Sequence, residues 1–186
     1  MQTYTDYLML IAPPKPVMYD IDRYKRASAR MIGNFAGMRS PAHISINQQH
    51  RCKPFISHHA IEQMGEKLGH LPPLELEISN FKYFNHGQTG MTIYACIVMN
   101  DHTARWFKLL RESMRVIHKN FVPHITVVKN IPAEKFNQLW PKFESSRYQS
   151  SFTADRLTVL ERETYNQQRK WEVLNEYRFG DKLMMY

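Results

Sequence analysis

Hydrophobic and polar residues follow two different periods along the chain, and together they predict a protein of mixed α and β structure. Uniformly apolar or alternating runs predict strands over residues 3–12, 42–47, 74–84, 91–99, 122–129, 152–162 and 170–179. Apolar residues at helical spacing predict helices over residues 20–32, 57–69, 101–119 and 132–140. We expect the prolines at positions 13, 14 and 16 to end the first strand, and Pro141 to end the last helix.

The same order of elements occurs twice. Each half reads strand, helix, short strand, helix, strand, and the halves meet at the turn-forming segment 86–90. This repeat predicts an α+β fold with two lobes related by an approximate twofold axis: two mostly antiparallel sheets line a central cleft, with helices on the outer faces. Because no linker-like segment separates the lobes, we expect residues 1–186 to form a single bilobal domain. A single mixed sheet without internal symmetry is the alternative.

Composition narrows the setting. The chain is 43% hydrophobic and 23% charged, which argues against disorder, and no apolar run reaches the roughly 18 residues of a membrane span. The first residues lack the basic start and apolar stretch of a secretory signal, and two cysteines cannot build a disulfide framework. We therefore expect a cytoplasmic protein without a membrane partner and, by default, a monomer. The net charge of +8 favours a phosphate-bearing ligand or a nucleic acid.

The third element of each half carries the same triplet. It is His43-Ile44-Ser45 in the first half and His124-Ile125-Thr126 in the second. Residues i and i+2 of a strand point to one face, so each histidine and its hydroxyl residue should face the cleft while the isoleucines enter the core. A pair of hydrogen-bonded, purely structural histidines is the alternative.

Two imidazoles that face one cleft suit the cleavage of a phosphodiester. Histidine titrates near pH 6.5, so one ring can act as the base and the other as the acid. The neighbouring hydroxyls can donate hydrogen bonds to the phosphate oxygens, and Lys129, at the end of the second motif strand, can contact a phosphate. This chemistry requires no metal, and the nearby histidines and cysteine at positions 50, 52, 58 and 59 match no standard ligand spacing.

The two motifs in repeated strand contexts resemble the 2H phosphoesterase superfamily, which includes 2′-5′ RNA ligase-like proteins and cyclic nucleotide phosphodiesterases. The resemblance implies a pseudo-symmetric bilobal fold, His43 and His124 as the acid–base pair, and Ser45 and Thr126 as phosphate-binding residues. Ligase-like members often carry Arg five positions after the second motif histidine, where this chain has Lys129. After the first motif they commonly continue as Phe-Leu-Gly, whereas this chain reads Asn-Gln-Gln-His over residues 47–50.

The resemblance further implies an activity. It predicts an enzyme that opens 2′,3′-cyclic phosphates to monoesters, on RNA ends or on cyclic nucleotides, without a cofactor. The reverse reaction would make it a 2′-5′ RNA ligase, with the roles of the two histidines exchanged. A non-catalytic module that binds nucleotides or RNA ends in the same cleft is the first alternative, and a purely structural basic domain is the second.

Overall fold

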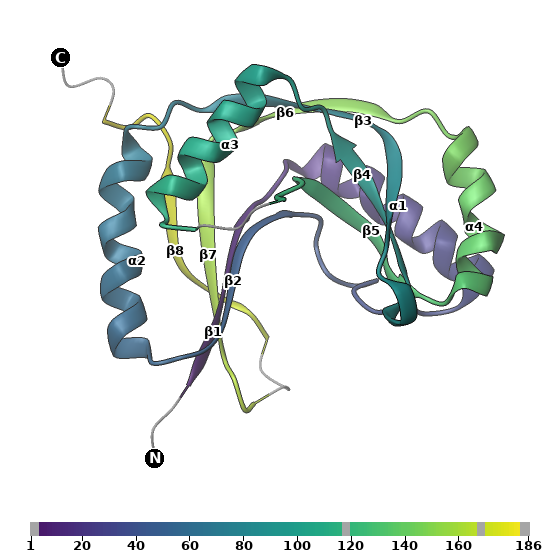
Figure 1. Ribbon diagram of the computed structural model, residues 1–186, viewed down its shortest axis with the longest axis horizontal. Coiled ribbons are helices and arrows are strands. Elements are labelled where there is room, and N and C mark those ends of the chain that lie inside the picture. The colour runs from purple at the N-terminus through teal and green to yellow at the C-terminus, as the bar shows by residue number, and fades with distance from the viewer. Residues whose placement is uncertain (1–3, 117–119, 167–169, 183–186) are drawn as a thin grey trace.

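The computed structural model describes residues 4–116, 120–166 and 170–182, and these residues alternate between strands and helices (Figure 1). The strands are β1 (Thr5–Ile11), β2 (Ile44–Cys52), β3 (Leu74–Asn85), β4 (Met91–Ile97), β5 (His124–Ile131), β6 (Gln149–Ala154), β7 (Arg156–Glu163) and β8 (Glu172–Arg178). The helices are α1 (Lys15–Ile32), α2 (Pro54–Gly69), α3 (Asp101–Ser113) and α4 (Ala133–Ser145), and a short 3₁₀ turn, η1 (Gly87–Thr89), joins β3 to β4. The predicted α+β class is confirmed.

All strand pairings among the described residues are antiparallel, and the strands lie in the order β6-β3-β4-β5-β2-β1-β7-β8. The order is symmetric about its centre, because β2 corresponds to β5 and β1 to β4. The two predicted sheets are thus the two halves of one sheet. They are joined where β2 meets β5, through the single pair Ile44 and Ile125. A junction this short leaves the two strands free to diverge on either side of it.

The helices divide between the halves of the sheet (Figure 1). Helices α1 and α4 pack on each other and on β5 and β3, whereas α2 packs on β8 and α3. The main core lies between sheet and helices, and Ile44, Ile93 and Ile125 are completely buried in it. None of the helices formed by the described residues is long and apolar enough to cross a membrane.

The structure corrects several predicted boundaries, and most of the errors involve proline. Helix α1 begins at Lys15 rather than at residue 20, because Pro16 lies in the first turn, where no backbone N–H is needed for an intrahelical bond. Pro141 does not end α4, which continues to Ser145. The buried side chains of Leu139 and Phe143 on either side of this proline hold that last turn against the core, which offsets the lost hydrogen bond.

Other boundaries differ for tertiary reasons. Strand β2 extends to Cys52, beyond the predicted end at residue 47, because β1 pairs with it over that length. The strand predicted over 152–162 divides at Asp155, since β6 pairs with β3 in one half of the sheet and β7 with β1 in the other. Helix α3 ends at Ser113, and the predicted end of that helix at residues 117–119 lies outside the described residues.

Candidate active site

The two motif histidines lie at the centre of the sheet, where its halves join. His43 directly precedes β2 and His124 is the first residue of β5. The buried pair Ile44 and Ile125 aligns the two strands. Continuing this register by one residue on each side places His43 opposite Thr126, and Ser45 opposite His124. Diagonal neighbours in such a pairing have Cα atoms about 7–8 Å apart, so the two imidazoles can approach one phosphate from opposite sides.

Both imidazoles are held in the same way. The His43 Nδ1 lies 2.8 Å from the Pro41 carbonyl oxygen, and the His124 Nδ1 lies 2.7 Å from the Val122 carbonyl oxygen. A carbonyl oxygen only accepts, so in each ring Nδ1 carries the hydrogen and donates it. In the neutral ring the lone pair is then on Nε2. The matching hydrogen bonds to the carbonyl two residues upstream leave Nε2 of both histidines as the ring nitrogen that can exchange a proton with a ligand.

The surroundings of the two histidines favour the neutral imidazole over the charged one. Burial lowers the pKa of His43, and the charges of Lys25, Lys129 and His124 lower it further, against the opposing hydrogen bond to Pro41. Burial likewise lowers the pKa of His124, and the charge of His86 adds to this effect. Both pKa values therefore lie below the ordinary value of about 6.5.

Aromatic side chains fix the position of the His124 ring. Phe84 and Tyr94 stack on each other with ring centroids 4.3 Å apart. The His124 ring lies 5.0 Å from Phe84 and 5.1 Å from Tyr94, measured between centroids. These contacts restrict rotation of the imidazole and exclude water from one side of it, which is consistent with the lowered pKa of His124.

The two hydroxyl residues of the motifs accompany the histidines. The Ser45 side chain is exposed and that of Thr126 is half-buried. Neither hydroxyl has a hydrogen-bond partner among the residues that the structure describes. Both hydroxyls are consequently available to a ligand that lies between the imidazoles.

A β-bulge brings Lys129 to the same face of the sheet. Tyr94 pairs with Thr126 and its neighbour Ile93 with Val128, so Val127 is an extra residue in β5. Val127 and Val128 are both buried, and the alternation of side chains resumes one residue later. Lys129 therefore shares the face of Thr126 instead of entering the core. This position agrees with the effect of its charge on the pKa of His43.

The first motif has a matching bulge, which identifies a residue that sequence analysis missed. Leu10 pairs with Ser45 and Met9 with Asn47, so Ile46 is the extra residue in β2. The Asn47 amide turns to the opposite face, where it contacts the sulfur of Met9. Gln48 pairs with Leu8 and returns to the face of Ser45. Gln48 follows His43 by five positions, as Lys129 follows His124, and this spacing is the signal that would have found it.

Two hollows flank the histidines. The larger, about 880 Å³, borders His43 and extends beneath the α1–β2 loop. The smaller, about 350 Å³, borders Ser45 and His124, with Gln48 and Phe84 in its wall. The site thus opens on both sides of the junction, and the two openings differ in size and lining.

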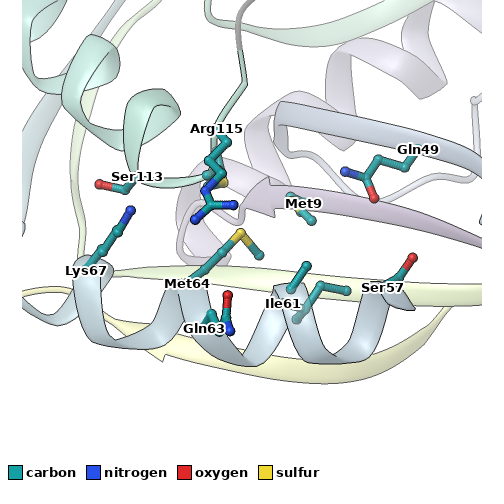
Figure 2. Close-up of a pocket in the computed structure, with 11 residues that line it drawn as sticks. Met9, Gln49, Ser57, Ile61, Gln63, Met64, Lys67, Ser113 and Arg115 are labelled. Atoms are coloured by element: carbon teal, nitrogen blue, oxygen red, sulfur yellow. The ribbon is translucent and has the colours of Figure 1, made fainter. Parts of the chain in front are cut away.

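A third hollow lies apart from the histidines. Figure 2 shows this pocket of about 110 Å³ between α2 and the end of α3, with Met9 of β1 at its floor. Its lining contains none of the five predicted site residues. Since Met9 points to the face of β1 opposite to that of Leu10, this pocket and the larger hollow lie on opposite sides of the strand.

The other histidines near residue 50 have structural partners. His58 contacts the Glu161 carboxylate at 3.1 Å, and His59 contacts the Gln63 amide at 2.9 Å. In the described part of the chain, no three His, Cys, Asp or Glu side chains form a group that could hold a metal ion.

Comparison with known proteins identifies the fold. A search of curated proteins returns no match to this sequence. Escherichia coli LigT in its apo form has a TM-score of 0.69 at 11% identity, with 96% of this chain and 98% of LigT covered. TT0787 of Thermus thermophilus gives a TM-score of 0.69 at 16% identity, covering 95% of this chain and 99% of that protein. E. coli LigT complexed with 3′-AMP gives a TM-score of 0.64 at 10% identity, covering 95% and 98%.

The fold and the paired motifs place the chain in a class of proteins. A pseudo-symmetric antiparallel sheet that presents a His-x-Ser/Thr triplet from each central strand defines the 2H phosphoesterase class, as the motifs predicted. The family model of the 2′-5′ RNA ligase superfamily matches residues 13–166, and the chain belongs to that family.

Proposed function

We propose that this protein is a metal-independent phosphoesterase that opens 2′,3′-cyclic phosphates, on RNA ends or nucleotides, with His43 and His124 as the acid–base pair. The observation that carries the proposal is the matched arrangement of the two imidazoles. Each donates from Nδ1 to a backbone carbonyl and keeps Nε2 for the substrate, beside a hydroxyl that has no partner in the described structure.

The reaction needs one proton removed and one delivered. One Nε2 accepts a proton from the attacking water as the new P–O bond forms. The other imidazole, protonated, donates its Nε2 proton to the departing ribose oxygen as the old P–O bond breaks. The product is a monoester with one free ribose hydroxyl, and the spent acid and base exchange protons with water. Run in reverse, with a ribose hydroxyl as nucleophile, the same steps would join RNA ends.

The substrate itself supplies the required protonation state. Both histidines have lowered pKa values in the free protein, which disfavours the protonated form that the acid needs. An anionic phosphodiester between the rings favours the charged form of the nearer imidazole. Ser45 and Thr126 then donate hydrogen bonds to the non-bridging oxygens, and Lys129 adds a positive charge.

Two further observations support a phosphate-bearing substrate. The net charge of the chain is +8, which raises the concentration of anions near the surface. LigT, which has a similar fold, has been crystallised with the nucleotide 3′-AMP. Transferred to this chain, that ligand class matches a site with two imidazoles, two hydroxyls and one lysine.

The test is hydrolysis of the four nucleoside 2′,3′-cyclic phosphates and of an RNA oligonucleotide with a cyclic phosphate end. We expect turnover to a 2′-phosphate, and a loss of at least about 100-fold in kcat for His43→Ala and for His124→Ala. His59→Ala is the matched control, because this histidine is exposed on α2 and its one hydrogen-bond partner among the described residues is Gln63.

The outcome separates the proposal from its rivals. Stoichiometric binding that depends on His43 and His124, without turnover, would make the protein a binding module. Turnover that survives both substitutions would refute the proposed acid–base pair.

A further inference from the structure

The larger hollow beside His43 continues the site face of the sheet. Leu10 pairs with Ser45 on one side and with Thr158 on the other, and Leu8 pairs with Leu160. Partners in a pairing share a face, so these side chains form a floor that begins at the motif serine and runs across β1 and β7. The floor borders a hollow of about 880 Å³, within the range of small-molecule sites.

The lining of this hollow is more apolar than a phosphate requires. Leu8 and Leu10 are buried, yet they lie outside the main hydrophobic core, on the other face of β1. Phe35, Met38 and Trp171 contribute further apolar surface around the same space. The two leucines, which lie on the site face away from the core, indicate a ligand with a flat or apolar group next to its phosphate.

The roof of the hollow is held in place. The α1–β2 loop is fixed by the buried Lys25, whose Nζ donates to the carbonyl oxygens of Ser40 at 2.7 Å and Gly37 at 3.3 Å. Ala36 of the same loop bridges to the backbone of Lys129. The hollow therefore exists before a ligand arrives.

Polar groups also line the hollow, among them Arg39, Lys170 and Glu176, and Glu176 is the carboxylate of this group. Glu176 pairs with Thr158 across β7 and β8, and its carboxylate accepts a hydrogen bond from the Thr158 hydroxyl at 3.3 Å. The other carboxylate oxygen of Glu176 lies 3.6 Å from the Arg156 guanidinium. An ionised carboxylate has about four acceptor positions, so it can accept from a ligand as well. Thr158 lies two strands from Ser45, about 10 Å at the usual strand spacing, which separates this acceptor from the phosphate position.

We infer that this hollow binds the base of the substrate and selects a nucleobase with an exocyclic amino group, which donates to Glu176 while Trp171 and the leucines contact the ring. The inference rests on the proposed function for the placement of the phosphate. An acyl chain would use the apolar lining but offer no hydrogen to the Glu176 carboxylate. Uracil presents at C4 a carbonyl oxygen, which a carboxylate repels, where cytosine presents an amino group.

The experiment compares 2′,3′-cyclic CMP with 2′,3′-cyclic UMP. The two bases differ at C4, which carries an amino group in cytosine and a carbonyl oxygen in uracil, and at N3, which accepts in cytosine and donates in uracil. We expect the wild-type protein to favour the cytidine substrate about tenfold or more in kcat/KM. Glu176→Gln should abolish that preference, because the Gln amide can also donate to uracil. Trp171→Ala should raise KM for both nucleotides and leave kcat nearly unchanged.

Matched controls and a second readout keep the result clear. Glu134→Gln removes an exposed carboxylate on α4 and Phe55→Ala an exposed ring on α2, and neither should alter the preference. Equilibrium binding of 3′-CMP and 3′-UMP tests the hollow independently of turnover. Binding that prefers CMP through Glu176, without hydrolysis, would support the base site and reject the proposed function.

Three results would overturn the inference. The first is equal kcat/KM and equal affinity for the two bases in the wild-type protein. The second is a cytidine preference that persists in Glu176→Gln. The third is hydrolysis of glycerol 1,2-cyclic phosphate, which has no base, as fast as that of cyclic CMP.

Discussion

Removing the charge of Lys129 is the most direct test of how the bulge in β5 builds the site. Lys129→Met keeps a long unbranched side chain, which preserves the cover that the Lys129 stem gives to Gly37, and deletes the ammonium group. The backbone bridge between Ala36 and residue 129 does not depend on the side chain. The substitution thus changes the electrostatics of the site more than its shape.

The size of the effect follows from charge and exposure. Two unit charges 4 Å apart attract by about 1 kcal/mol in water and about 4 kcal/mol at an effective dielectric constant near 20. Lys129 is exposed and forms no ion pair with any described residue. We therefore expect its attraction to the phosphate to lie near the lower of these two energies. About 1–2 kcal/mol corresponds to a loss of about 5- to 30-fold in kcat/KM. Lys129→Arg, which keeps the charge, should stay within about threefold.

The assay measures kcat/KM for a 2′,3′-cyclic nucleotide and competitive inhibition by inorganic phosphate, each at low and high salt. The loss in Lys129→Met should shrink as salt screens the exposed charge. Lys142→Met, which removes an exposed lysine from α4, serves as the control for net charge. If the two Met variants bind phosphate equally and turn over equally, Lys129 does not face the phosphate, and the argument from the bulge fails.

Three other predictions follow from the same structure. Because both histidine pKa values are lowered, a pH–rate profile should place the optimum of kcat/KM below about pH 6.5. Lys129→Met should raise the pKa of His43 and move one limb of that profile to higher pH. Gln48→Arg should tighten phosphate inhibition a few-fold at low salt only, and an equal effect at high salt would contradict it. Burial raises the pKa of Asp6, but hydrogen bonds from the Arg51 amide, Thr164 and Arg162 outweigh burial and leave that pKa lowered. The ionised Asp6 carboxylate therefore stabilises the folded protein fully above about pH 4, and this stabilisation is lost as pH falls through the folded-state pKa. Asp6→Asn should therefore lower the free energy of unfolding by about 1–3 kcal/mol at pH 7, a difference that denaturant titration should find smaller near pH 3.

Much of the fold could be predicted because the local patterns and the final packing agree. Strands such as β1 and β4 are apolar on both faces, since one face meets the core and the other borders the site. The repeat of elements survives as the symmetric order of the strands. What could not be predicted was the exchange of third strands: β3 pairs with β4 of the second half, and β7 pairs with β1. That choice depends on contacts between distant segments, about which local periodicity carries no information.

The same difference between local pattern and tertiary contact explains the errors in the predicted helix boundaries. Proline near residue 15 and at residue 141 was interpreted from its general effect on helices, which depends on position within the helix. In α1 it falls in the first turn, and in α4 the burial of neighbouring side chains outweighs the loss of one hydrogen bond. Only the tertiary structure determines which of these circumstances applies.

The candidate site shows how far strand alternation reaches. Alternation alone placed each histidine beside its hydroxyl, and the structure has them on one face. Counted further, the same rule sends Lys129 and Gln48 to the core side, because each lies an odd number of residues from its histidine. One extra residue in each strand, Val127 and Ile46, reverses the count. A β-bulge is defined by the partner strand as well as by its own residues, so it is invisible in a single run of sequence.

The paired bulges also account for the asymmetry of the site. They bring corresponding residues to the two ends of the site, where one end carries the cation of Lys129 and the other the neutral amide of Gln48. Lys129 lies at the His43 end, where its charge lowers the pKa of that histidine, and the proposed function gives it a phosphate to bind there. Gln48 lies at the His124 end, in the wall of the smaller hollow, where an amide can both donate and accept. A symmetric pair of histidines would bind a phosphodiester in either direction. Under the proposed function, the unlike residues at equivalent positions would give the substrate one direction, and with it they would decide which ribose oxygen faces which imidazole.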